Sequence, residues 1–198
     1  MADGSRLGVF GGTFDPVHNG HVVAAVSSRH ALVLDRVLVV PAREPWQKRD
    51  RDLAPAEDRF AMLHAAFDGI DGIGLSRLEL DRPGPTYTAD TLEELSKGTP
   101  EPQLFLIVGA DAAADLATWD RPEAIRSLAT IVIVSRADLA APAAPGPGWR
   151  VEHVRIPALE LSSTDLRRRV AAGEPLEGLM PPGAVRCLRE RGLYAGLR

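Results

Sequence analysis

Residues 7–21 read LGVFGGTFDPVHNGH, and the order of residue types in this stretch predicts the first elements of the fold. Leu7–Phe10 is a short apolar run that stops at two glycines, which is typical of a buried strand running into a tight loop. A helix is expected to begin near Asn19 and to continue through the valines that follow. A strand, a glycine loop and a helix N-terminus in succession can bind an anion, because the loop and the helix offer amide N–H groups.

Apolar runs and helical patterns alternate along the rest of the chain. Strands or extended segments are expected near residues 37–40, 75–80, 104–108, 131–134 and 151–156. Helices are expected to begin after Pro55 and at a Thr88 cap, and to cover residues 162–172 and 183–191. This alternation predicts an α/β fold, a Rossmann-like doubly wound parallel sheet flanked by helices, with a small C-terminal helical portion from about residue 160 to 198. Such sheets bind ligands at the carboxyl ends of their strands.

The 198 residues suit a single domain, because a chain of this length can bury a substantial core without disulfides. Hydrophobic residues make up 45% and charged residues 25%, which is ordinary for a globular protein and argues against disorder. The lone cysteine, Cys187, excludes an intramolecular disulfide and a cysteine-only zinc site. Residues 137–148, rich in Ala, Pro and Gly, are expected to form a flexible surface loop within this domain.

The net charge of −4 argues against a broad nucleic-acid-binding surface. No apolar stretch is long enough to span a bilayer and no secretory signal pattern is seen, so we expect a cytoplasmic protein that does not bind membranes. Small phosphorylated ligands stay compatible with this charge, because a few local cations can bind them. The sequence leaves a homo-oligomer open.

The glycine loop matches neither of the two common phosphate-binding loops. No Gly-Lys-Ser/Thr follows it, and Gly8, Gly11 and Gly12 lack the G-x-G-x-x-G spacing. The last two glycines let a ligand approach the backbone, while His18 and His21 share one face at a helix start and suit a phosphoryl group. The alternative is a simple turn with surface or metal-binding histidines, although no third histidine or cysteine lies nearby for zinc.

A second candidate anion site opens the late helix at Ser162–Arg167. Either of the two serines can act as N-cap, and the first has the capping-box spacing with Asp165. Taken alone, capping explains the serines. Hydroxyls, free amides and the Arg167 guanidinium can also form an anion site, whereas Arg168 and Arg169 are expected on a solvated face.

The first string resembles the H-x-G-H nucleotidylyltransferase superfamily, and its full length is similar to the nicotinate mononucleotide adenylyltransferase branch. The late Ser-Ser-Thr-Asp-Leu-Arg resembles the second phosphate motif of that family. The resemblance implies catalytic roles for His18, His21 and Arg167. It implies that ATP is bound by Gly11, Gly12, Thr13, Phe14, His18, His21, Ser163, Thr164 and Arg167.

Three strings in the middle of the chain, at residues 41–48, 84–92 and 109–119, resemble the same branch. The first departs from the family pattern at Trp46 and Gln47. The resemblance implies that the mononucleotide is bound by Lys48, Thr88, Asp111 and Trp119.

Each of these four residues has a physically suitable chemistry and a simpler alternative. The resemblance places Lys48 near the mononucleotide or the reacting phosphate, and the helix N-terminus at Thr88 near the nicotinate carboxylate. It places Asp111 on ribose hydroxyls and Trp119 against the pyridine ring. Without the resemblance, the lysine would be a solvated charge, the threonine a helix cap and the tryptophan equally suited to the core.

The reaction implied by the resemblance transfers the adenylyl group of ATP to nicotinate mononucleotide, giving nicotinate adenine dinucleotide and pyrophosphate in NAD biosynthesis. Its nucleophile is a phosphate oxygen that is already ionised at neutral pH, so no general base is needed. This agrees with the lack of an obvious carboxylate pair or Ser-His-Asp arrangement. Mg²⁺ is expected to enter with ATP, and no protein metal ligand is assigned.

Two other functions stay open at this point. One is a related adenylyltransferase that acts on pantetheine phosphate. The other is a nucleotide sensor that has kept the fold and lost turnover. If the protein is instead a nicotinate mononucleotide adenylyltransferase, its partners are ATP and nicotinate mononucleotide.

Overall fold

A computed structural model describes residues 5–45, 53–98, 101–136 and 144–195 of the chain. Within them, six strands form one sheet in the order β3-β2-β1-β4-β5-β6, and every neighbouring pair is parallel. The strands are β1 (Arg6–Gly12), β2 (Arg36–Pro41), β3 (Ile73–Leu75), β4 (Gln103–Gly109), β5 (Ala129–Arg136) and β6 (Val151–Ile156). In this doubly wound order the direction of winding reverses between β1 and β4. The predicted fold class is confirmed.

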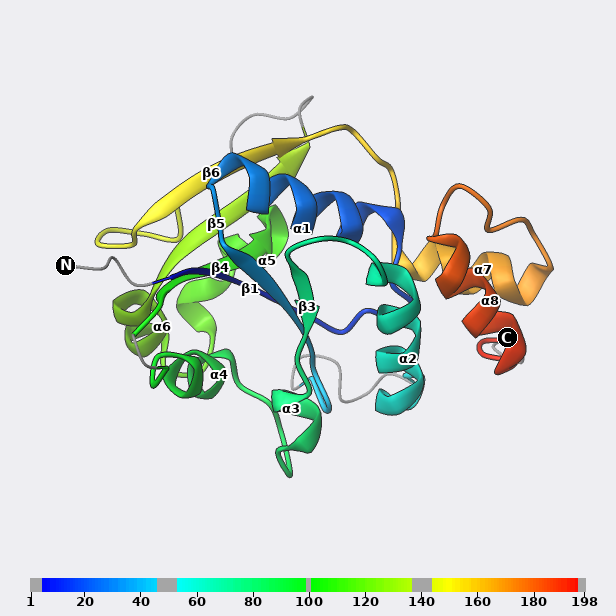
Figure 1. Cartoon of the computed structure of the whole chain (residues 1–198), viewed down its shortest axis with the longest axis horizontal. Helices are drawn as coiled ribbons and strands as arrows, with labels where there is room; N and C mark the ends of the chain where they lie inside the picture. The colour runs from blue at the N-terminus through cyan, green and yellow to red at the C-terminus, as the bar shows by residue number, and fades with distance from the viewer. Residues whose placement is uncertain (1–4, 46–52, 99–100, 137–143, 196–198) are drawn as a thin grey trace.

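Helices connect most of the strands and follow the last one (Figure 1). They are α1 (Asn19–Ala31), α2 (Ala56–Phe67), α3 (Leu78–Asp81), α4 (Thr88–Leu95), α5 (Ala110–Ala114), η2 (a 3-10 turn at Leu116–Thr118), α6 (Pro122–Leu128), α7 (Ser163–Ala172) and α8 (Pro182–Glu190). Figure 1 shows α7 and α8 at the end of the molecule opposite the N-terminus.

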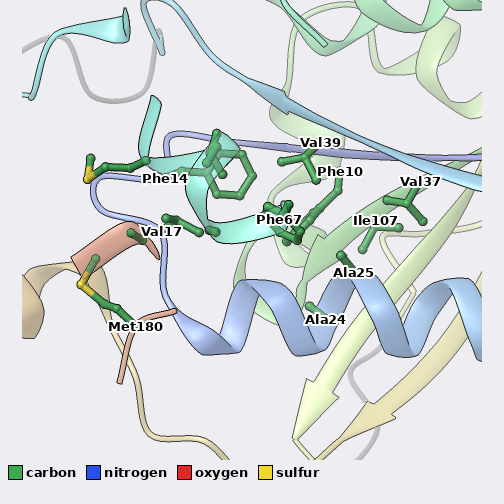
Figure 2. Close-up of a cluster of buried hydrophobic side chains, with 14 of the residues drawn as sticks. Phe10, Phe14, Val17, Ala24, Ala25, Val37, Val39, Phe67, Ile107 and Met180 are labelled. Carbon is green, nitrogen blue, oxygen red and sulfur yellow. The ribbon is translucent and has the colours of Figure 1, made fainter. Parts of the chain in front are cut away.

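Both faces of the sheet are buried, as the continuous apolar runs of its strands predict. Phe105 and Ile107 of β4 face a core that they share with α1, α2 and α8, and Figure 2 shows Ile107 beside Ala24 and Ala25 of α1. Leu106 belongs to a second core, which contains residues of α4, α5 and α6. The alternation of side chains along one strand therefore places helices on both faces of the sheet.

The strands β1 and β4 separate at their carboxyl ends. Their pairing ends at Val9 and Leu106, although β1 continues to Gly12 and β4 to Gly109. Over the same residues β1 stays paired with β2, up to Gly12 opposite Pro41. The point where the strand order reverses is therefore an opening in the sheet, which is where a doubly wound fold binds ligands.

Three local expectations were wrong. β1 continues through Gly12 because its glycines keep extended backbone and pair with β2, where a loop was predicted. Residues 75–80 do not form one extended segment, because β3 is a short edge strand and α3 begins at Leu78. Tyr87, not Thr88, has the extended backbone of an N-cap, so Thr88 is the first helical residue of α4.

Between β4 and β5 lie three short elements, α5, η2 and α6, that the sequence pattern did not predict. They have five, three and seven residues, which is too short to show a helical period.

The late helix agrees with its prediction, because Ser162 Oγ accepts a hydrogen bond from the Asp165 amide at 3.1 Å and Gly173 ends the helix with a φ of 68°. Of the loop expected over residues 137–148, residues 137–143 lie outside the described residues. In the described ranges, no helix has both the length and the apolarity that crossing a membrane requires.

Candidate active site

A cavity of about 250 Å³ opens where β1 and β4 separate. Its walls come from these two strand ends, from the segment after β2, from α3 and α4, and from Trp119. The lining residues are Phe10, Gly11, Gly12, Thr13, Ala42, Pro45, Glu79, Thr86, Thr88, Leu106, Ile107, Val108, Gly109, Ala112 and Trp119. The structure thus brings together five residues that the sequence analysis selected in three separate strings: Gly11, Gly12, Thr13, Thr88 and Trp119.

Gly11 and Gly109 line this cavity, and neither the backbone conformation nor the packing of the protein requires glycine at these two positions. Neither has a positive φ. A Cβ atom built on either would meet nothing within 4 Å, so a side chain there would fill cavity space without a clash. Glycine at both strand ends fits a ligand that approaches the backbone closely.

Gly12 is different, because a Cβ atom there would lie 2.9 Å from the ring of Phe14. Phe14 has a left-handed φ of 50°, a conformation that costs a non-glycine residue about 1–2 kcal/mol. Its ring is 3% exposed and packs edge-on against His21, with ring centroids 5.0 Å apart. The Phe14 side chain therefore supports the His21 ring, which leaves only its backbone for the predicted contact with ATP.

His18 and His21 stand together at the start of α1. His18 is the N-cap residue, and the two rings are stacked with centroids 3.7 Å apart. The His18 amide donates a hydrogen bond to Nδ1 of His21 at 3.1 Å. Because that nitrogen is an acceptor, the ring proton of His21 is on Nε2, which can donate to a phosphate oxygen.

Burial sets the charge of His18. Desolvation lowers the pKa of His18 from 6.5 to about 4, so this ring is neutral at pH 7. In the sequence analysis the resemblance implied a catalytic role for both histidines. In the ligand-free protein, His18 can supply only a neutral N–H donor.

The N-terminus of α7 lies against residues 11–18, which run from the last two residues of β1 to the N-cap of α1 and are here called the 11–18 loop. Nη1 of Arg167 donates to the backbone carbonyl of Asp15 at 2.6 Å, and Ser163 Oγ donates to the carbonyl of Pro16 at 2.9 Å. Thr164 is exposed and accepts a hydrogen bond from Arg167 Nη2 at 3.3 Å. The two candidate anion sites are therefore in direct contact, through bonds between residues 147 and 152 positions apart in the sequence.

The other arginines of α7 face away from this contact. Arg168 and Arg169 form ion pairs with Asp165 and Glu174, and about half of the Arg168 side chain is exposed. Of the three consecutive arginines, only Arg167 bonds to the 11–18 loop.

Comparisons with known proteins agree with this geometry. A cytidylyltransferase-like family model matches residues 9–169. Probable nicotinate-nucleotide adenylyltransferases of Acidothermus cellulolyticus and Streptomyces coelicolor are 44% and 45% identical to this chain, over 96% and 94% of its length and 94% and 99% of theirs. The chain belongs to the nicotinate-nucleotide adenylyltransferase family. A solved structure of Plasmodium falciparum nicotinic acid mononucleotide adenylyltransferase complexed with NaAD shares the fold, with a TM-score of 0.78 at 19% identity over 96% of this chain and 97% of that one.

The mononucleotide-binding residues predicted from the family resemblance are only partly brought together. Thr88, at the start of α4, and Trp119 face the same cavity. Asp111 lies on the exposed first turn of α5, two residues after the cavity-lining Gly109, and does not itself line the cavity. Lys48 lies outside the described residues.

Arg59 is a buried residue of the site that the sequence analysis missed. Its side chain is 1% exposed and donates to the carbonyls of Thr13 and Ala42, both at 2.8 Å, and to those of Arg43 and Ala54, both at 3.0 Å. It thereby joins the 11–18 loop to the segments that follow β2 and precede α2. A signal was present in the sequence, because an arginine stands at helical spacing with the buried residues of α2.

Glu79 is a second missed residue, and it lines the cavity. The residue is 7% exposed, and its carboxylate accepts a hydrogen bond from Thr91 Oγ1 at 2.7 Å. Burial raises the pKa of Glu79 above its ordinary value. The cavity therefore has an acidic group in its wall. The sequence analysis missed Glu79 because it expected an extended segment near residues 75–80 and did not predict α3.

The burial of His18 predicts a pH dependence of stability. Above pH 6.5 the ring is neutral in both states and contributes nothing. Between pH 6.5 and about 4 the unfolded chain binds a proton that the folded chain does not, so stability falls by about 3 kcal/mol over this window. Urea unfolding at pH 7.5 and pH 4.5 should show this loss in the wild type and much less of it in His18→Asn.

His30→Ala is the control, because His30 is exposed in the last turn of the same helix. Its removal should leave the acid loss of stability in place. Equal pH dependence in the wild type and His18→Asn would mean that His18 titrates normally in the folded protein.

Alanine substitutions at the two adjacent glycines should have different effects, one on activity and the other on stability. Gly11→Ala should change the free energy of unfolding by less than about 0.5 kcal/mol, because its Cβ meets no protein atom. It should lower kcat/KM by about tenfold or more by displacing the ligand. Gly12→Ala should cost about 1–3 kcal/mol of stability through the Phe14 ring. Full activity in Gly11→Ala would remove this strand end from the binding site.

Proposed function

We propose that the protein transfers the adenylyl group of ATP to nicotinate mononucleotide, giving nicotinate adenine dinucleotide and pyrophosphate in NAD biosynthesis. The observation that carries the proposal is the contact of the α7 N-terminus with the 11–18 loop, in which Arg167 bonds to Asp15 and Ser163 to Pro16, between the glycines and the histidine pair in the sequence. Relatives that are named nicotinate-nucleotide adenylyltransferases over nearly the whole chain support this substrate pair.

The chemistry requires positioning more than proton transfer. An ionised phosphate oxygen of the mononucleotide attacks the α-phosphorus of ATP, and a new P–O bond forms as the bond to the bridging oxygen of the β-phosphate breaks. Pyrophosphate leaves with that electron pair. The protein must therefore hold two anions in line and stabilise the charge that develops on the α-phosphate.

In this proposal each group in contact with the 11–18 loop has one task. His21 donates to ATP from Nε2, and His18, which stacks on it and bonds to its Nδ1, is proposed as a second donor to ATP. Ser163, Thr164 and Arg167 bind the triphosphate of ATP, while Gly11 and Gly12 let its phosphates approach the backbone.

The divalent cation that such a transfer requires is proposed to be Mg²⁺ bound to ATP, as part of the substrate. Among the residues that the structure describes, no group of three or more His, Cys, Asp or Glu side chains could hold a metal ion. The oxygens of the triphosphate are the hard ligands that Mg²⁺ prefers, so no protein residue is assigned to it.

The cavity between β1 and β4 is proposed to take the mononucleotide. Trp119 would stack on the pyridinium ring, and the amides at the start of α4 by Thr88 would bind the nicotinate carboxylate. Asp111 would bind ribose hydroxyls from the first turn of α5, and Lys48 is proposed to bind the mononucleotide. The net charge of −4 supports small-molecule partners over nucleic acid, and we place this activity in the cytoplasm.

The decisive experiment is a pyrophosphate-release assay with Mg²⁺, ATP and one acceptor at a time. Nicotinate mononucleotide, nicotinamide mononucleotide and pantetheine phosphate are the acceptors to compare. Release with pantetheine phosphate alone would transfer the protein to a different adenylyltransferase function. No release with any acceptor, in a protein that still binds ATP, would indicate a nucleotide sensor.

His21→Ala should lower kcat by about 10²-fold or more, because the variant loses a donor to the charge that develops in the transition state. Steady-state pyrophosphate release measures this. His64→Ala, an exposed histidine of α2, is the control and should turn over normally. Near-normal turnover in His21→Ala would exclude His21 from the chemistry.

Trp119→Ala should raise the KM for nicotinate mononucleotide by about tenfold, the scale of a lost ring-stacking contact, and the KM for ATP much less. Initial rates over a grid of both substrate concentrations measure the two constants. Equal increases in both would argue against stacking on the acceptor ring.

A further inference from the structure

Tyr194 returns from the C-terminal end of the described chain to the 11–18 loop. Its hydroxyl donates to Oδ1 of Asp15 at 2.7 Å, and the two residues are 8% and 3% exposed. Tyr194 follows α8 and lies outside residues 9–169, which the family model matches. A buried phenol and a buried carboxylate thus form a hydrogen bond between segments 179 residues apart.

Asp15 uses its two carboxylate oxygens for different partners. Oδ1 accepts from the Tyr194 hydroxyl and from the amide of Ala54, the latter at 3.2 Å. Oδ2 has no hydrogen-bond partner among the described residues and lies 3.6 Å from Nη1 of Arg167. The same Nη1 donates to the Asp15 carbonyl at 2.6 Å. Asp15 therefore binds Nη1 of Arg167 in two ways, by a hydrogen bond to its backbone carbonyl and by the charge of its carboxylate.

The position of Arg167 needs such a fixed partner. Leu166 is the one buried residue of α7, so apolar packing holds this helix only weakly. An arginine side chain on such a helix has many rotamers, and ordering it costs conformational entropy. The Arg167 side chain is nevertheless only 21% exposed, against 54% for its neighbour Arg168.

We propose that Tyr194 is a positioning residue that acts through Asp15 to hold Arg167 toward ATP. The inference rests on the proposed function, which assigns Arg167 to the triphosphate. Two donors on Oδ1 fix the rotation of the carboxylate, so that Oδ2 faces the guanidinium. Because the carboxylate is removed from water, its attraction for the guanidinium is stronger than that of an exposed ion pair.

Other charges around Asp15 do not replace Tyr194. Arg59 of α2 is the second cation whose charge acts on Asp15, but its hydrogen bonds all go to the backbone carbonyls described above. Without the phenol, Oδ1 keeps the Ala54 amide as its one donor among the described residues, and the carboxylate is free to rotate.

The test is Tyr194→Phe in the full chain, with steady-state kinetics for both substrates. This variant removes one oxygen and keeps the ring in the core. The kcat/KM for ATP should fall about tenfold, as expected for a lost hydrogen bond to a buried charge, while the KM for nicotinate mononucleotide stays within about twofold. The same substitution in an Arg167→Ala background should have no further effect, because two residues that act through one interaction are not additive.

Arg191→Ala is the matched control. Arg191 lies three residues before Tyr194 and pairs with Asp58 of α2, so its removal loosens the same segment without touching Asp15. It should lower the Tm and leave kcat/KM for ATP unchanged.

An unchanged kcat/KM for ATP in Tyr194→Phe, or an equal loss in the wild-type and Arg167→Ala backgrounds, would overturn the positioning role. No pyrophosphate release by the wild type would instead contradict the proposed function itself. In that case Mg²⁺-ATP binding by calorimetry still tests the inference, because Tyr194→Phe should weaken it about tenfold and an unchanged affinity would overturn it.

Discussion

The candidate site depends on how the backbone carbonyls of the 11–18 loop are bound. Three of them accept hydrogen bonds from Arg59, Arg167 and Ser163, at 2.6–2.9 Å. A carbonyl oxygen carries partial negative charge and would repel a phosphate placed beside it. Two guanidinium groups and a hydroxyl offset the charge of these oxygens, so the amides of the loop and of the start of α1 would favour an anion there. Without these donors the same glycine loop would be a poor anion site.

The same bonds explain why the late part of the chain belongs to the site. The α7 N-terminus contacts the loop through Ser163 and Arg167, and Asn19 at the start of α1 donates to the carbonyls of Leu179 and Gly178 between α7 and α8. The N-termini of α1 and α7 thus meet at one loop. Polar contacts between residues that are far apart in the sequence hold them there. Packing alone would not define this geometry, since α7 buries little apolar surface.

The sequence predicted what depends on local pattern. Apolar runs located β1 and β4, capping residues located α7, and the glycines and histidines located the 11–18 loop. The short elements between β4 and β5 were missed because they are shorter than the period that reveals a helix. The bonds of Arg59 and Tyr194 were missed for another reason: their partners are backbone carbonyls and a carboxylate that only the folded chain brings near. Family resemblance could assign Arg167 to ATP, but it could not say what holds that side chain.

The charge of each buried side chain in the site depends on whether the fold supplies hydrogen-bond partners for its charged form. A permanent cation such as Arg59 needs full compensation, and four carbonyls supply it. The rings of His18 and His21 are stacked with centroids 3.7 Å apart, and two charged rings at this distance would repel each other strongly. Burial therefore keeps His18 neutral in the free protein. A triphosphate beside the pair would favour the protonated form, because an adjacent opposite charge raises the pKa of an imidazole. If the site binds a triphosphate as proposed, it can gain positive charge at His18 when that anion is present.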